Sequence, residues 1–233
     1  MLVLGVESSA GAASAAVAKD GALLGEFFVN TKQTHSQTLM PMVEALLRNL
    51  GLCCGDLDRF AVASGPGSFT GVRIGVACVK GMALPLNTPC CGVPTLEAIA
   101  YGGLSCAGSI LCAAMDARRS QVYNALFRSE GGRLVRLTED RAISIAQLGE
   151  ECRQYGERLL LLGDGAALCH QAFASWGARL APETVCYQRA GSVALLAADK
   201  PALDPAALLP VYLRLPQAER ELKRKKELGQ EEE

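Results

Sequence analysis

The stretch that decides the fold is RFAVASGPGSFTGVRIG, residues 59–75. Its first part, residues 59–64, is an apolar run typical of a buried strand. The glycines and the proline of residues 65–68 predict a sharp turn. A helix is expected from about residue 70 to residue 83, with Ser68 as its N-cap. The stretch therefore predicts a strand, a turn and a helix in succession, as in α/β proteins.

The rest of the N-terminal half continues this alternation. Asp20-Gly21 separates two apolar runs and is a strong signal for a type I′ hairpin, because glycine tolerates the positive φ of that turn. Thr34 or Ser36 is an expected helix N-cap, and Gly51 is the expected C-cap of the same helix. The predicted elements of this half are strands at 2–6, 14–18, 22–29, 59–64 and 90–93, and helices at 34–51, at 70–83 and from Pro94 onward.

The C-terminal half repeats the beginning of that order. Its predicted elements are strands at 109–115, 121–127, 133–137 and 158–162, a helix at 145–154, and a helix after Gly163-Asp164-Gly165. The glycines of residues 101–108 suit a hinge. We therefore expect two lobes, residues 1–102 and 103–210. Residues 211–233 are expected to form a helical tail, and its packing on the N-terminal lobe stays open.

Composition excludes several classes of protein. The 233 residues carry 23 Lys and Arg against 24 Asp and Glu, a net charge of −1. Phosphate binding depends on clustered Lys and Arg, so a direct reader of DNA or RNA is disfavoured. No basic region precedes the apolar start, and no apolar run reaches the roughly 18 residues of a membrane span. We expect a cytoplasmic protein that does not bind membranes.

The cysteines give no metal-binding pattern. The chain has ten, of which Cys53-Cys54 and Cys90-Cys91 are adjacent pairs, and it has no C-x-x-C. Only His35 and His170 add imidazole ligands. We expect reduced, buried thiols and no structural metal site.

The motif Gly65–Gly75, with His35-Ser36 and Pro41 before it and Gly92–Glu97 after it, resembles the TsaB (YeaZ) family. Pro210–Arg214 and Gln217–Arg220 are similar to the end of that family. The resemblance implies an α/β, actin-like (ASKHA, ribonuclease H-like) two-lobed fold with mixed sheets. It also implies a non-catalytic subunit beside a TsaD-type enzyme, which transfers threonylcarbamoyl to the adenosine next to the anticodon of tRNA, and a TsaE-type ATPase in the same assembly.

The resemblance also bears on catalysis. In the related catalytic subunit, the segment equivalent to Val93–Ala100 carries two histidines that hold a metal. Thr95 and Ile99 stand at those positions here, and isoleucine has no donor atom. The departure argues against catalysis, so we expect no catalytic residue and no metal.

Nucleotide binding is a weaker expectation. The resemblance to actin-like ATPases points to six candidate contacts, namely Ser8, Ser9, Asp116, Gly163, Asp164 and Gly165. Glu7 stands where an aspartate is expected, and its longer side chain would crowd a metal-bound phosphate. No cofactor is required by the implied role. Weak binding of ATP or ADP, and tight turns of an inherited scaffold, are the two readings left open.

The helix after the turn predicts an interface. Val72, Val76 and Val79 form one apolar stripe, and Gly71, Gly75, Cys78 and Met82 form a second, which would let another backbone approach closely. Together with the preceding helix, the expected interface residues are Leu39, Met42, Val43, Leu46, Gly71, Arg73, Ile74, Gly75, Cys78 and Met82. The occupant would be a TsaD-type subunit, or a second copy in a homodimer. On this view Gly75→Arg would leave the monomer folded and abolish partner binding.

Two other functions remain as alternatives. One is an ATP-dependent, kinase-like enzyme on the same fold. The other, a metallopeptidase, is weaker because no ligand pair or nucleophile arrangement supports it. His35 is expected to cap the start of a helix, and Tyr212 to serve packing. The Lys223–Lys226 run is expected to be a solvated helix face, so tRNA would be contacted only indirectly.

Overall fold

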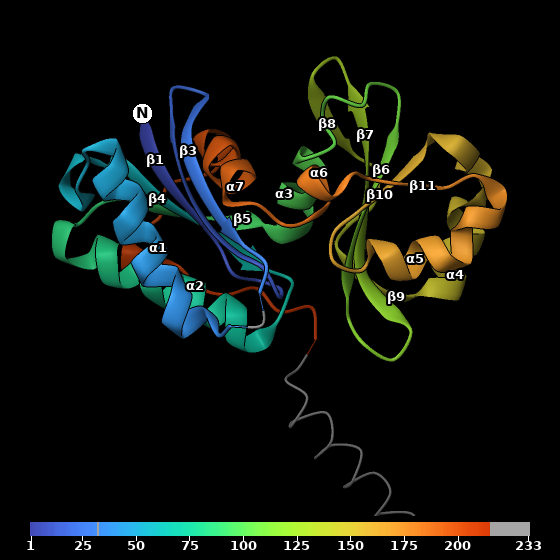
Figure 1. Ribbon diagram of the computed structural model, residues 1–233, viewed down its shortest axis with the longest axis horizontal. Coiled ribbons are helices and arrows are strands. Elements are labelled where there is room, and N and C mark those ends of the chain that lie inside the picture. The colour runs from blue at the N-terminus through green and yellow to red at the C-terminus, as the bar shows by residue number, and fades with distance from the viewer. Residues whose placement is uncertain (32, 215–233) are drawn as a thin grey trace, which may run out of the picture.

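A computed structural model describes residues 1–31 and 33–214, and it arranges them in two lobes with one sheet each (Figure 1). The first sheet has the strand order β3-β2-β1-β4-β5. Its strands are β1 (Leu2–Glu7), β2 (Ala13–Lys19), β3 (Ala22–Val29), β4 (Arg59–Gly65) and β5 (Cys90–Pro94). β1, β2 and β3 are antiparallel, whereas β4 and β5 run parallel to β1. Asp20 and Gly21 both have positive φ, so the type I′ hairpin is confirmed.

Helices cover both faces of this sheet. The helices α1 (His35–Leu50) and α2 (Phe69–Ala83) pack on one face, where their apolar side chains meet Leu4, Val6 and Val17. The other face carries α3 (Thr95–Tyr101) and α7 (Ala190–Leu196), which pack on Val3 and Ala16. Alternate residues of β1 thus pack in two different cores, because successive side chains of a strand point to opposite faces of the sheet.

Helix α7 corrects the expected lobe boundary. Residues 103–210 were assigned to the second lobe, but α7 packs on β1, β2 and β3 of the first sheet. The approach is so close that a Cβ atom on Gly5 would lie 2.6 Å from the Ala190 carbonyl oxygen. The chain therefore returns to the first lobe before residue 190, because small residues on β1 and α7 let the helix lie against the strand.

The second lobe is built around β6 (Ile110–Asp116). The sheet order is β11-β10-β6-β7-β8, with β9 also paired to β7. β10 and β11 run parallel to β6, and the β7 pairings are antiparallel. The remaining elements are β7 (Gln121–Glu130), β8 (Arg133–Arg136), β9 (Arg141–Ser144), β10 (Leu159–Leu162), β11 (Arg179–Leu180), α4 (Ile145–Cys152), α5 (Ala166–Phe173) and α6 (Glu183–Cys186). The sequence did not predict β9 and β11, since four and two residues carry little periodicity.

Short 3-10 turns join several of these elements. They are Cys54–Asp56, Leu84–Leu86, Arg153–Arg158, Ala174–Trp176, Ala197–Asp199 and Pro205–Ala207. Helix α2 and the turn that follows it, Phe69–Leu86, are long and apolar enough to cross a membrane by length and composition alone. One side of α2 instead packs on the first sheet through Val72, Val76 and Val79, as a core helix of an α/β protein does.

The chain after the last 3-10 turn runs along the first lobe. Leu208 is buried in the core under α2, and the Lys80 ammonium donates to the carbonyl oxygens of Ala206 and Leu208, at 2.8 Å and 3.2 Å. Residues 211–214 are not helical, so the expected helical tail is wrong for these four residues. The rest of the predicted tail, with the Lys223–Lys226 run, lies outside the described residues.

Candidate docking face and interlobe cleft

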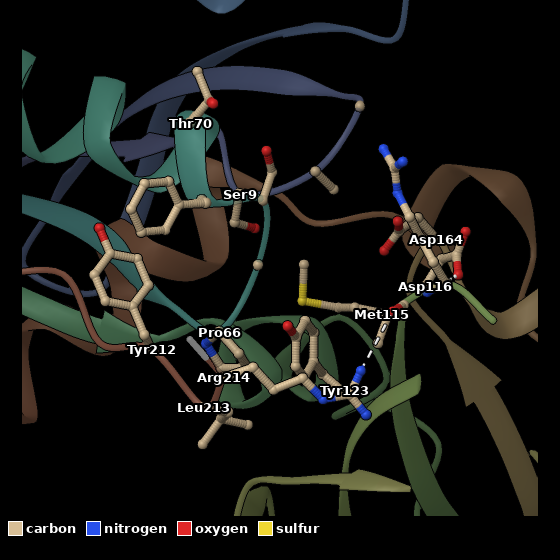
Figure 2. A pocket seen from close by; sticks show the side chains of 17 residues that line it. Ser9, Pro66, Thr70, Met115, Asp116, Tyr123, Asp164, Tyr212, Leu213 and Arg214 are labelled. Atoms are coloured by element: carbon tan, nitrogen blue, oxygen red, sulfur yellow. Dashed lines mark hydrogen bonds between the residues drawn. The ribbon is translucent and has the colours of Figure 1, made fainter. Parts of the chain in front are cut away.

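A cavity of about 530 Å³ opens between the lobes (Figure 2). The first lobe contributes the loop Ser9–Gly11 and the turn into α2, Pro66–Thr70. The second lobe contributes the end of β6 and the turn after it, with Tyr123 and Asp164. The segment 212–214 completes the lining. The cavity is thus formed by both lobes and by the last described residues of the chain.

Half of the six expected nucleotide contacts line this cavity. Ser9, Asp116 and Asp164 do so. Ser8 does not, because its hydroxyl donates a hydrogen bond of 2.9 Å to the Gly71 carbonyl oxygen. The structure therefore brings together the acidic members of the expected set and gives Ser8 a role in packing.

The two glycines beside Asp164 are also absent from the lining among the described residues. A Cβ atom on Gly163 would collide with the Ala114 carbonyl oxygen, and one on Gly165 would lie 2.9 Å from the Asp116 amide nitrogen. Gly163 in addition has a φ of 100°, which disfavours other residues. Both glycines let the turn after β10 pack on β6. This role fits the alternative in which Gly163-Asp164-Gly165 is a tight turn of the scaffold.

Glu7 does not crowd the cavity, contrary to our expectation. Its side chain is fully buried and turns back, so that the Ser9 amide donates to Oε1 at 2.5 Å. Oε2 has no hydrogen-bond partner among the described residues. Burial, together with the nearby Asp164 carboxylate, raises the pKa of Glu7 to about 7. Burial also raises the pKa of Asp164.

Thr95 and Ile99, which stand where the related catalytic subunit has metal-binding histidines, have structural roles. Thr95 is buried, and its hydroxyl accepts a hydrogen bond of 3.2 Å from the Gly65 amide. Ile99 lies in the core of the second lobe. In residues 1–31 and 33–214, no three His, Cys, Asp or Glu side chains come together as metal ligands.

The expected interface residues of α1 are core residues. Leu39, Met42, Val43 and Leu46 are at most 6% exposed and pack on the first sheet. These four side chains therefore belong to the core of the first lobe and leave little surface for a partner. The wide apolar arc of α1 is explained by contacts with the sheet on one side and with α2 on the other.

Gly71 and Gly75 of α2 are also buried inside the chain. A Cβ atom on Gly71 would collide with the Ser8 carbonyl oxygen, and one on Gly75 would lie 2.5 Å from Ser8 Oγ and 3.1 Å from a Val62 methyl. The second backbone that these glycines admit is the end of β1 in the same chain. We therefore no longer expect Gly75→Arg to leave the monomer folded, because the added side chain would overlap Ser8 and Val62.

The remaining expected residues lie at the surface. Arg73 is exposed, and Ile74, Cys78 and Met82 are half-buried. Around them lie further apolar or small exposed residues that the sequence reasoning missed. Together these define what we call the docking face: Met40, Pro41, Ile74, Ala77, Cys78, Gly81 and Met82. A groove of about 670 Å³ between α1 and Met82 continues it toward Leu52, Cys53 and Cys54.

Charged side chains border the docking face. Glu44 and Arg48 lie one turn apart on α1, with 3.9 Å between Oε1 and Nη1, and both are largely exposed. An apolar centre with a polar rim is the usual composition of a protein interface. Met40, at 40% exposure, is the most exposed large apolar side chain of α1.

The roles of Tyr212 and Arg214 were missed as well. Tyr212 was expected to serve packing alone, yet it lines the cavity and accepts a hydrogen bond of 2.8 Å from Arg73 Nε. Arg214 also lines the cavity. The only sequence signal was the similarity of Pro210–Arg214 to the family's ending, which says nothing about what these side chains contact.

Comparison with known proteins decides the family. The family model described as "TsaD: tRNA N6-adenosine threonylcarbamoyltransferase" matches residues 24–202. The chain is 32% identical over 228 residues to the "tRNA threonylcarbamoyladenosine biosynthesis protein TsaB" of Bacillus subtilis, covering 94% of this chain and 96% of that protein. This chain belongs to the TsaB family. The TsaB protein of Escherichia coli is 37% identical over 134 residues, which cover 57% of this chain and 58% of that protein.

Solved structures agree with this assignment. YeaZ from Pseudomonas aeruginosa matches with a TM-score of 0.71 and 25% identity, over 91% of this chain and 99% of that chain. The ethanolamine utilization protein EutJ from Carboxydothermus hydrogenoformans, 12% identical with a TM-score of 0.51, shares the fold alone. The TsaB (YeaZ) resemblance and the actin-like α/β fold with mixed sheets are confirmed. The family name supports a role in tRNA threonylcarbamoyladenosine biosynthesis.

Proposed function

We propose that this TsaB-family chain is a non-catalytic subunit of the assembly that forms threonylcarbamoyladenosine in tRNA, and that it binds and activates a TsaD-type transferase. The observation that carries the proposal is the docking face, an apolar strip on two neighbouring helices that the described chain leaves exposed. Exposed apolar strips with a polar rim are typical of protein interaction sites.

The non-catalytic part of the proposal has separate support. The hydroxyl of Thr95 is already bonded to the Gly65 amide, and the side chain of Ile99 lies in a hydrophobic core. Ile99 has no donor atom, and the Thr95 hydroxyl is used in packing, so neither position resembles a pair of metal-binding histidines. The chain would therefore act on its partner's conformation: a subunit that binds the active form about 100-fold better shifts the equilibrium by about 2.7 kcal/mol.

The other expected partners belong to the same proposal. The docking face would pair with a second copy when the transferase is absent, and a TsaE-type ATPase would join the assembly. The near-zero net charge of the chain favours indirect contact with tRNA. The cytoplasm, where tRNA is modified, would be its location.

Nucleotide binding is proposed only as a weak property of the interlobe cavity. Its support is that Asp116 and Asp164 line the cavity near the first turn of α2. The role proposed for the chain requires no cofactor. An ATP-dependent, kinase-like activity is the alternative, and the same two carboxylates are what would support it.

Reconstitution tests the proposal directly. The chain is mixed with a TsaD-type subunit, a TsaE-type ATPase, ATP, tRNA and the threonylcarbamoyl donor, and modified adenosine is measured with each protein omitted in turn. We expect product only when this chain and the TsaD-type subunit are both present. Equal product without this chain would contradict an activating role, and product without the TsaD-type subunit would contradict a non-catalytic one.

A further inference from the structure

The two lobes are connected at three places. The chain leaves the first lobe after α3 at Tyr101 and returns between α6 and α7 at residues 187–189. The last described residues, 212–214, line the interlobe cavity, and the Arg214 side chain reaches the second lobe there. We refer to residues 211–214 as the third passage. In Figure 1 the first two passages lie near α3 and α6, while the last described residues run below them. The third passage lines the interlobe cavity, which neither of the other two does.

The beginning of this third passage is fixed to the first lobe. The Val211 amide donates a hydrogen bond of 2.7 Å to the Ser64 carbonyl oxygen. A Cβ atom on Gly65 would collide with the Val211 carbonyl oxygen, so the segment lies directly on the end of β4. The Tyr212 ring packs against Phe69 with 4.8 Å between the ring centroids.

The end of the passage is fixed to the second lobe. Arg214 Nη2 donates to Gln121 Oε1 at 2.6 Å, and Nη1 donates to the Ala117 carbonyl oxygen at 3.5 Å. The guanidinium carbon lies 5.6 Å from the centroid of the Tyr123 ring. Ala117 and Gln121 close the turn between β6 and β7, because the Ala117 amide donates to the Gln121 carbonyl oxygen at 3.0 Å.

We propose that residues 211–214 are a latch that holds the two lobes in one arrangement, with Arg214 as the residue that closes it. Two passages near α3 and α6 would by themselves allow the lobes to rotate about that region, as in hinge motions. A third connection at the cavity removes this freedom. Among the described residues, the Arg214 side chain makes the polar contacts of the latch with the second lobe, so replacing this one side chain should release it.

The latch also contacts Arg73, which lies next to the docking-face residue Ile74 on α2. Arg73 on α2 donates its Nε hydrogen to the Tyr212 hydroxyl at 2.8 Å, and its guanidinium carbon lies 3.8 Å from the Phe69 ring centroid. A partner that displaces the Arg73 side chain would loosen Tyr212 and, through it, Arg214. This second step rests on the proposed function, whereas the latch itself does not.

Hydrogen exchange in the isolated chain tests the latch. Arg214→Ala is compared with Arg128→Ala, which removes an exposed guanidinium of the same lobe that is bonded to Glu130 alone among the described side chains. We expect the Val211 amide to exchange at least about tenfold faster in Arg214→Ala, in line with the loss of a hydrogen bond from a charged group. The radius of gyration from X-ray scattering should rise as well. Arg128→Ala should change neither.

A milder variant separates the latch from a folding defect. Tyr212→Phe keeps the ring and loses only the bond to Arg73, so Val211 exchange should accelerate less than in Arg214→Ala while the thermal midpoint is preserved. Exchange and scattering equal to wild type in Arg214→Ala would overturn the latch, and so would equal changes in Arg128→Ala.

The coupling to the docking face is tested by adding a TsaD-type subunit to the wild-type chain and to Arg73→Ala. We expect faster exchange of the Ala117 amide on binding in the wild type and no further change in Arg73→Ala. Binding without any change at Ala117 would overturn the coupling and leave the latch standing. Absence of binding would contradict the proposed function, while the measurements on the isolated chain still decide the latch.

Discussion

Gly75 of α2 lies directly against Ser8 at the end of β1: a Cβ atom at Gly75 would be 2.5 Å from the Ser8 hydroxyl oxygen. Ser8 in turn donates to the Gly71 carbonyl oxygen one turn earlier. Gly71 and Gly75 of α2 therefore let this helix lie against the residues that follow β1 in the same chain.

We expect Gly75→Ala to lower the free energy of unfolding by about 1–3 kcal/mol, because the added methyl group overlaps Ser8. Gly81 is the matched control in the same helix, since nothing lies within 4 Å of a Cβ atom there. Gly81→Ala should raise the free energy of unfolding by about 0.5–1 kcal/mol through helix propensity. Urea unfolding of both variants measures this. Equal effects would contradict the packing described for Gly75.

Ala77 is an exposed residue on the docking face, and it tests the interface without disturbing the core. Ala77→Arg should weaken binding to a TsaD-type subunit at least about tenfold, since a buried unpaired charge costs more than 1.4 kcal/mol. Analytical centrifugation measures the association, and circular dichroism checks the fold.

The control for this charge is Ala146→Arg, at an exposed position of α4 in the other lobe. It should bind like the wild type. Normal binding by Ala77→Arg, or an equal loss in Ala146→Arg, would rule out the docking face as the contact.

Glu7 makes the stability of the chain depend on pH. Burial raises its pKa from 4.5 to about 7, so the folded chain holds this proton at pH values where the unfolded chain has lost it. The stabilisation of the folded chain by this bound proton is fully present below pH 4.5 and is lost as the pH rises through 7. Glu7→Gln should therefore be more stable than the wild type at pH 8, by about 2–3 kcal/mol, with little difference at pH 4.5.

Urea unfolding at both pH values measures the effect. Glu150→Gln, at an exposed position of α4, should leave the pH dependence unchanged. A difference in stability between Glu7→Gln and the wild type that is the same at both pH values would contradict the raised pKa of Glu7.

Asp116 distinguishes the scaffold from the kinase-like alternative. With magnesium and ATP, the isolated chain should show no turnover above that of Asp116→Ala. Phosphate release measures this, and calorimetry measures any weak nucleotide binding. Turnover by the wild-type chain that Asp116→Ala abolishes would replace the proposed function with an ATP-dependent activity.

Much of the first lobe could be predicted from sequence. The Asp20-Gly21 hairpin, the Gly65–Ser68 turn and the strand–helix order depend on local backbone preferences, which neighbouring residues encode. The candidate site was predicted less well. Asp116 and Asp164 do line the cavity, but Gly163 and Gly165 serve the packing of β10 on β6.

By itself, the sequence determined the element order, the turn chemistry and the motif that places the chain in the TsaB family. The tertiary structure alone decided what covers each apolar face. Periodicity showed that α1 and α2 are apolar on more than one side, yet it could not tell a partner protein from Ser8 of the same chain. Periodicity also could not predict that α7 packs on the first sheet, or that Tyr212 contacts Arg73, 139 residues away in the chain. These contacts join segments far apart in the chain, and such contacts leave no periodic trace in the sequence.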